Sequence, residues 1–169
     1  MNDSDPLSPA VSAPTRSTQL LVQTFDRDRV TEVRHTVAQH AEAVGLGGER
    51  LDDFVLAVNE LITNAVRHGG GRGGLRLWFA EGVLHCVVSD TGTGITGDRL
   101  DEHARPEPET AGGWGLWLAR QLSDEMLVRS GADGTTVRIS ARVDTVAPEL
   151  DVRQLGEVIG RPEEVTGAN

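Results

Sequence analysis

The sequence has no lysine and a single cysteine, and each scarcity excludes a class of protein. All 16 basic residues are arginines, so the chain lacks the lysine that a GxxxxGK[ST] phosphate loop requires, which excludes a Walker-type NTPase. Cys86 cannot form an internal disulfide, and residues 1–10 are polar and acidic where a secretory signal would be basic and then apolar. No apolar run approaches the roughly 18 residues of a membrane span. We therefore expect a cytoplasmic protein without membrane association.

Positive charge is also scarce. The 26 acidic residues outnumber the 16 basic ones, and the formal net charge of −10 argues against direct nucleic-acid binding. With 169 residues, of which 38% are apolar, the chain is long enough to bury the core of one domain.

Composition and periodicity divide the chain into three parts. Residues 1–18 hold three of the seven prolines and few large aliphatic side chains, which predicts a disordered arm. Residues 19–143 carry the periodic pattern of a folded domain, and residues 144–169 form an acidic tail that we expect to be flexible. The expected elements are a strand at 19–25, helices at 28–44 and 51–66, a hairpin at 75–80 and 83–90, a helix at 116–122, and a hairpin at 126–129 and 136–143. The stretch 91–113 is interpreted as a lid.

Three polar residues share one face of the second helix. Glu60, Asn64 and His68 are four residues apart and, at roughly 100° per residue, lie within an arc of ~80° opposite the apolar side. A carboxylate can accept a proton from an attacking hydroxyl, and an amide oxygen is a ligand that Mg²⁺ accepts alongside substrate phosphates. The row suits phosphoryl transfer, with His68 or Arg67 near the phosphates, although a solvated helix face would show the same pattern.

Two glycine-rich segments follow. Asp90 ends a strand and precedes Gly92 and Gly94, a combination that suits adenine because the carboxylate accepts a hydrogen bond from an exocyclic amine beside a close backbone. Gly113 and Gly115 precede a helix whose free N–H groups are available to phosphate oxygens. Each segment taken alone is equally well interpreted as a flexible connection. An aspartic-protease loop is disfavoured because a long helix precedes the first segment.

The order of four motifs is more specific than any one of them. NELITNAVRHG, VVSDTGTGI, GGWGL and DGTTV occur in this order and resemble the N box, two glycine boxes and final strand of the GHKL ATPase superfamily. The small size, without dimerisation helices, is most similar to its anti-sigma-factor serine/threonine kinases. The resemblance implies an α/β two-layer sandwich, the Bergerat fold, in which helices cover one face of a mixed, mostly antiparallel sheet.

The resemblance also implies roles for individual residues. Glu60 is the expected catalytic base, Asn64 the Mg²⁺ ligand, and Asp90 the partner of the adenine amino group. The remaining residues expected to bind ATP are His68, Gly92, Gly94, Arg105, Gly113, Gly115, Leu116 and Thr135.

The function implied is an ATP- and Mg²⁺-dependent serine/threonine kinase of the anti-sigma type. It would phosphorylate a STAS-type anti-anti-sigma partner and bind a sigma factor, and a homodimer is left open. The lid departs from the family, because acids outnumber the cations Arg99, His103 and Arg105 between residues 95 and 112. A non-catalytic, nucleotide-gated binding module is therefore the second hypothesis, and Arg105 is the cation expected to reach the terminal phosphate.

Overall fold

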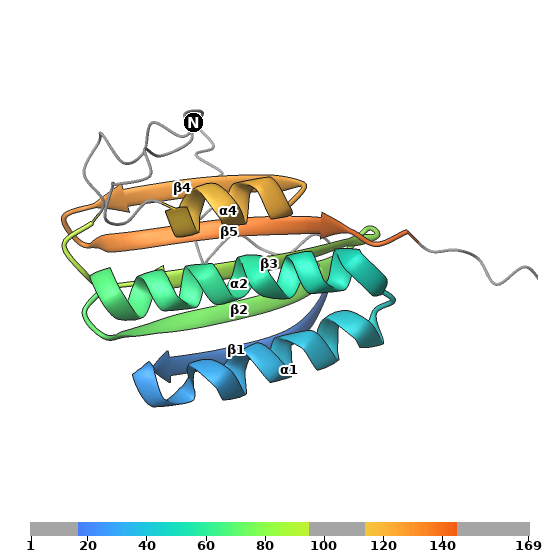
Figure 1. The fold of residues 1–169 in the computed structure, drawn as a ribbon, viewed down its shortest axis with the longest axis horizontal. Coiled ribbons are helices and arrows are strands. Elements are labelled where there is room, and N and C mark those ends of the chain that lie inside the picture. Colours follow the sequence, from blue (N-terminus) through green and yellow to red (C-terminus); the bar gives the residue numbers. More distant parts are fainter. Residues whose placement is uncertain (1–16, 95–113, 145–169) are drawn as a thin grey trace, which may run out of the picture.

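The computed structural model describes residues 17–94 and 114–144, which form a two-layer α/β sandwich (Figure 1). The strands are β1 (Ser17–Asp26), β2 (Arg72–Ala80), β3 (Val83–Asp90), β4 (Glu125–Gly131) and β5 (Gly134–Arg142). The helices are the short 3-10 helix η1 (Arg27–Arg29) and the α-helices α1 (Val30–Ala43), α2 (Gly48–His68) and α4 (Trp114–Leu122). The predicted fold class is confirmed.

The five strands form one sheet in the order β1-β2-β3-β5-β4. Every pairing among the described strands is antiparallel. After β3 the chain first forms the edge strand β4. It then turns back to form β5, which lies between β3 and β4. This order places the carboxyl end of β3 beside the amino end of β5, with Asp90 opposite Thr135.

The three α-helices within the described residues lie on the same face of the sheet (Figure 1). The apolar side of α2 packs against the sheet, and Phe54, Val58 and Ile62 on this side are fully buried. Removing such side chains from water supplies roughly 1.5–3 kcal/mol each, so this helix anchors the core. None of the helices in the described parts is long and apolar enough to span a membrane.

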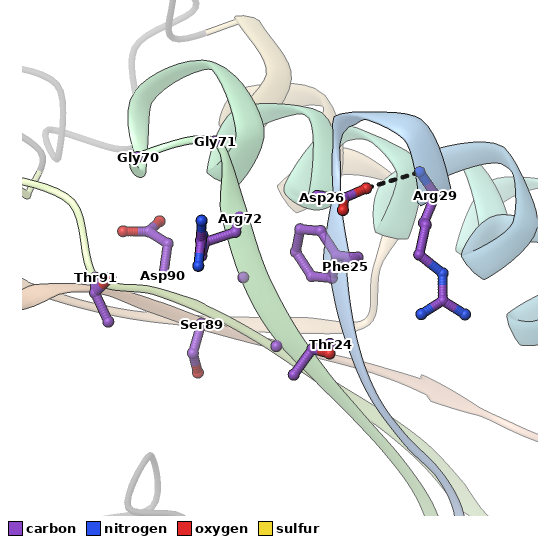
Figure 2. Close-up of a pocket in the computed structure, with 12 residues that line it drawn as sticks. Thr24, Phe25, Asp26, Arg29, Gly70, Gly71, Arg72, Ser89, Asp90 and Thr91 are labelled. Atoms are coloured by element: carbon purple, nitrogen blue, oxygen red, sulfur yellow. Dashed lines mark hydrogen bonds between the residues drawn. The ribbon is translucent and has the colours of Figure 1, made fainter.

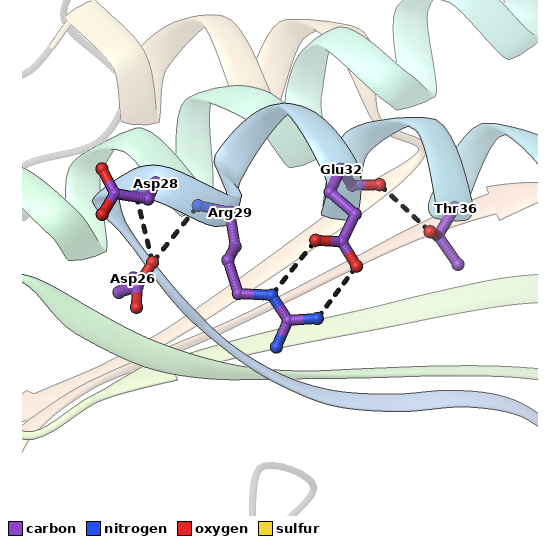
Figure 3. Close-up of polar contacts among 5 residues, drawn as sticks. All are labelled: Asp26, Asp28, Arg29, Glu32 and Thr36. Carbon is purple, nitrogen blue, oxygen red and sulfur yellow. Dashed lines mark hydrogen bonds and ion pairs between the residues drawn. The ribbon is translucent and has the colours of Figure 1, made fainter.

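The connection from β1 to α1 is set by a capping aspartate (Figure 3). Asp26 Oδ1 accepts hydrogen bonds from the backbone N–H groups of Asp28 (3.0 Å) and Arg29 (3.2 Å). Those N–H groups open the helix and have no partner inside it, so the carboxylate satisfies them. The Arg29 guanidinium then pairs with Glu32 at 2.9 Å, one turn further on.

The β2–β3 hairpin closes with the two residues predicted for it. Glu81 (φ 52°) and Gly82 (φ 78°) both adopt the left-handed conformation, which matches the twist of the flanking strands in a two-residue turn.

A second polar connection joins α2 to the far end of the sheet. Asp124 Oδ2 accepts from Arg50 Nη2 at 2.8 Å and from the backbone N–H of Arg142 at 2.6 Å. Arg50 also donates to the Arg142 carbonyl oxygen at 2.7 Å. The start of α2 is therefore tied to the end of β5.

The predicted elements all occur, with shifted ends. The first strand begins at Ser17 rather than Gln19, the second strand at Arg72 rather than Leu75, and the last helix at Trp114 rather than Leu116. Backbone pairing extends strands into polar and glycine residues that carry no alternation, which explains the missed ends. The predicted arm up to residue 16, most of the lid (95–113) and the tail from residue 145 lie outside the described residues.

Candidate functional site

Asp90 is held in one orientation at the end of β3. Its Oδ1 accepts hydrogen bonds from the backbone N–H groups of Gly92 (3.0 Å) and Thr135 (3.2 Å). Within residues 17–94 and 114–144, no group donates to Oδ2. Oδ1 is thus fixed by the backbone, and Oδ2 is left as a hydrogen-bond acceptor. A carboxylate held in this way can accept a hydrogen bond from an exocyclic amine.

Glycines allow the backbone to close tightly around this carboxylate. A Cβ on Gly92 would stand 2.6 Å from Gly69 Cα and 2.8 Å from the His68 carbonyl oxygen. A Cβ on Gly94 (φ 84°) would overlap the Gly131 carbonyl. The first glycine box therefore touches the end of α2 on one side and the β4–β5 hairpin on the other.

Thr135, which the resemblance implies for the adenine pocket, is buried beside Asp90. Its side chain is 6% exposed, and its hydroxyl lies 2.8 Å from that of Ser130, its cross-strand partner. Ser130 lies in none of the motifs that predict the site. The signal that identifies it is the hairpin register, because a two-residue turn at 132–133 places residue 130 opposite residue 135.

Glu60 and Asn64 meet the second glycine box. A Cβ on Gly115 would stand 2.9 Å from Glu60 Oε2 and 3.8 Å from Asn64 Oδ1, so the first turn of α4 lies directly against these two side chains. Both residues are half-buried. The Leu116 side chain is buried in the core at 8% exposure, which leaves only its backbone for a ligand. The carboxylate, the amide and the N-terminal turn of a helix, which attracts anions, converge here.

His68 is separated from that cluster. It is exposed at the last turn of α2, and its carbonyl group packs against Gly92 at the Asp90 end of the site. The structure thus brings the His68 backbone next to the first glycine box, and its predicted role near the phosphates stays a prediction. Arg105 and Gly113 lie outside the described residues.

The residues present fit ATP and Mg²⁺. Half-buried Asn64 offers a hard oxygen beside the first turn of α4, where a Cβ on Gly115 would stand 3.8 Å from it. Asp90 offers the free acceptor at the other end. Asn64 is therefore the residue that would hold the metal, and Asp90 the residue that would select the base.

A pocket of about 640 Å³ has Asp90 in its lining (Figure 2). It is lined by residues at or next to the ends of β1, β2 and β3, including Arg72 and Ser89, and by Arg29 of η1. Of the described residues that are predicted to bind ATP, only Asp90 lines it. The pocket is therefore separate from the cluster of Glu60, Asn64 and Gly115, none of which lines it.

The fold and site together define a class. A histidine kinase-like ATPase domain matches residues 24–141, and the chain belongs to this family. The resemblance to GHKL ATPases is thereby confirmed, and the family is one that binds ATP.

Relatives of this chain include proteins named serine-protein kinase RsbW and anti-sigma F factor. The serine-protein kinase RsbW of Bacillus velezensis is 30% identical over 120 residues, covering 64% of this chain and 74% of the relative. The anti-sigma F factor of Geobacillus thermodenitrificans is 29% identical over 121 residues, covering 65% of this chain and 82% of the relative. These names agree with the predicted anti-sigma serine kinase type.

A solved structure supports the same type. The RsbU and RsbW domains of Rv1364c from Mycobacterium tuberculosis align with a TM-score of 0.55 and 25% identity, covering 78% of this chain. This chain spans 33% of that longer chain.

Proposed function

We propose that this protein is an ATP- and Mg²⁺-dependent serine/threonine kinase that acts as an anti-sigma regulator, with residues 19–143 as its kinase domain. The proposal rests mainly on the close approach of Gly115 to Glu60 and Asn64. This approach brings the proposed base Glu60, the proposed metal ligand Asn64 and the start of α4 together. The free oxygen of Asp90 supplies the adenine contact at the other end of the site.

Each residue has a distinct task. Asp90 Oδ2 accepts a hydrogen bond from the adenine amino group, while Thr135 N–H keeps Oδ1 in place. Asn64 Oδ1 holds the metal, which when bound neutralises charge on the phosphates. The Glu60 carboxylate accepts the proton of the acceptor hydroxyl as that oxygen bonds to the terminal phosphorus and ADP departs.

The partner that fits this activity is a STAS-type anti-anti-sigma protein that presents a serine. In its unmodified form this partner would compete for the kinase, and after phosphorylation it would release the kinase to hold a sigma factor. The relatives named serine-protein kinase and anti-sigma F factor support both halves of this cycle.

Incubating the protein with γ-labelled ATP, Mg²⁺ and candidate STAS domains tests the proposal. We expect label on a partner serine with wild type and its loss with Glu60→Gln, whereas Glu49→Gln, on the exposed first turn of the same helix, should retain transfer. If no partner is labelled but partner binding still responds to ATP, the protein is the nucleotide-gated module suggested by its acidic lid.

A further inference from the structure

Gly69 ends α2 in a conformation that does not itself require glycine. Its φ of −105° and ψ of 22° are accessible to other residues, and its N–H donates to the Ala65 carbonyl oxygen at 2.8 Å. The residue is nevertheless buried. The reason for glycine at this position therefore lies in the space around it.

That space is taken by Asp90. A Cβ on Gly69 would overlap Asp90 Cγ, stand 2.5 Å from Asp90 Cβ and lie 2.6 Å from the Ala65 carbonyl oxygen. Real Cβ atoms do not approach other heavy atoms this closely, so one of these groups has to move. The nearest of them is the carboxylate carbon itself.

Asp90 borders an open pocket, but its carboxylate cannot move into that space without losing two hydrogen bonds. Two backbone N–H groups, from Gly92 and Thr135, hold Oδ1. On the helix side, Gly92 already packs against Gly69 Cα and the His68 carbonyl, so that this segment of loop cannot follow. Moving the carboxylate breaks these hydrogen bonds and turns Oδ2 away from its present position.

We propose that Gly69 is a positioning residue for base selection: by lacking a Cβ, it lets the end of α2 close against Asp90 and so keeps Oδ2 aimed at the nucleobase. This inference rests on the proposed function, because it assigns to Asp90 the recognition of adenine. It predicts that base selectivity is set partly by a residue that does not touch the nucleotide.

The test compares Gly69→Ala with Gly74→Ala, a control whose added Cβ meets nothing within 4 Å. ATP and GTP affinities are measured by titration, together with thermal unfolding. We expect Gly69→Ala to lose at least tenfold in ATP affinity with little change for GTP, so that the ATP-to-GTP preference falls toward one. Gly74→Ala should retain the wild-type preference.

Two results would overturn the positioning role while leaving the proposed function intact. One is wild-type base selectivity that survives in Gly69→Ala, and the other is an equal loss of ATP and GTP affinity, which would make Gly69 a packing residue only. If wild type itself binds both nucleotides equally, the adenine assignment fails and the inference fails with it.

A second variant covers the case in which Gly69→Ala does not fold. Adding Asp90→Gly removes the atoms that the new Cβ would overlap, so the double variant should fold and unfold at a higher temperature than Gly69→Ala alone. Failure of the double variant to recover would place the conflict at the Ala65 carbonyl group and refute the contact with Asp90.

Discussion

Gly115→Ala is expected to separate stability from activity, because the new methyl group meets a side chain and not the backbone. The Cβ would stand 2.9 Å from Glu60 Oε2, the mobile end of a long side chain, and 3.8 Å from Asn64 Oδ1, an ordinary contact distance. Glu60 should swing aside at small cost, while the metal ligand should stay in place.

Gly115→Ala should raise the stability of the fold and lower the rate of phosphoryl transfer. Alanine is preferred to glycine inside a helix by about 0.8–1 kcal/mol, and since position 115 is in the first turn of α4 we expect about half of that as added stability. Displacing a catalytic base by about 1 Å costs on the order of 10²-fold in rate. We therefore expect kcat to fall about 100-fold, with less than a threefold change in KM for ATP.

Single-turnover phosphorylation of the partner and thermal unfolding, measured on the same samples, check this prediction. Gly47→Ala is the control, because its Cβ would meet nothing within 4 Å and it lies about 20 Å along α2 from Glu60. The double variant Glu60→Ala with Gly115→Ala should phosphorylate the partner as fast as Glu60→Ala alone. A wild-type rate in Gly115→Ala would refute the placement of Glu60 as the base.

Three further predictions follow from the remaining contacts. Asp90→Asn should weaken ATP binding by about 1–3 kcal/mol, because its amide can present a donor to the exocyclic amine; equal ATP and GTP affinities in wild type would contradict this assignment. Asn64→Ala should abolish the Mg²⁺ dependence of ATP affinity, whereas Glu60→Ala should leave ATP affinity nearly unchanged. Calorimetric titration of both variants with and without Mg²⁺ tests this. If Asn64→Ala keeps the wild-type Mg²⁺ dependence, the polar face of Glu60, Asn64 and His68 is only a solvated helix face. Asp124→Asn should destabilise the fold by about 1 kcal/mol, a value reduced by solvent screening of a half-exposed pair. Burial opposes ionisation of Asp124, but hydrogen bonds from the Arg142 backbone N–H and from Arg50 outweigh it and lower its pKa. The difference in free energy of unfolding between wild type and Asp124→Asn should hence be complete above about pH 4 and should disappear as the pH falls through the lowered pKa. Urea unfolding at several pH values measures this difference, and a difference that stays constant down to about pH 2 would contradict the prediction.

Local features of the fold were predictable from the sequence because they repeat within a few residues. The spacing of Phe54, Val58 and Ile62 identifies the buried side of α2, and their complete burial confirms it. Glu81-Gly82 between two apolar runs predicts the hairpin turn. The motif order identified the family, and with it the antiparallel sheet covered by helices on one face.

Contacts between distant segments were decided only by the tertiary structure. Nothing local to Asp90 predicts that Thr135, 45 positions later, donates to its Oδ1, because that hydrogen bond exists only when β5 inserts between β3 and β4. The same holds for Gly69, which looks like an ordinary helix stop until the sheet brings Asp90 against it. Helical periodicity places His68 and Asn64 on one face of α2, but only the tertiary structure shows that α4 packs against Asn64 and that the first glycine box packs against the His68 backbone. Periodicity is a property of neighbours along the chain, whereas a binding site is made by the close packing of segments that meet only after folding.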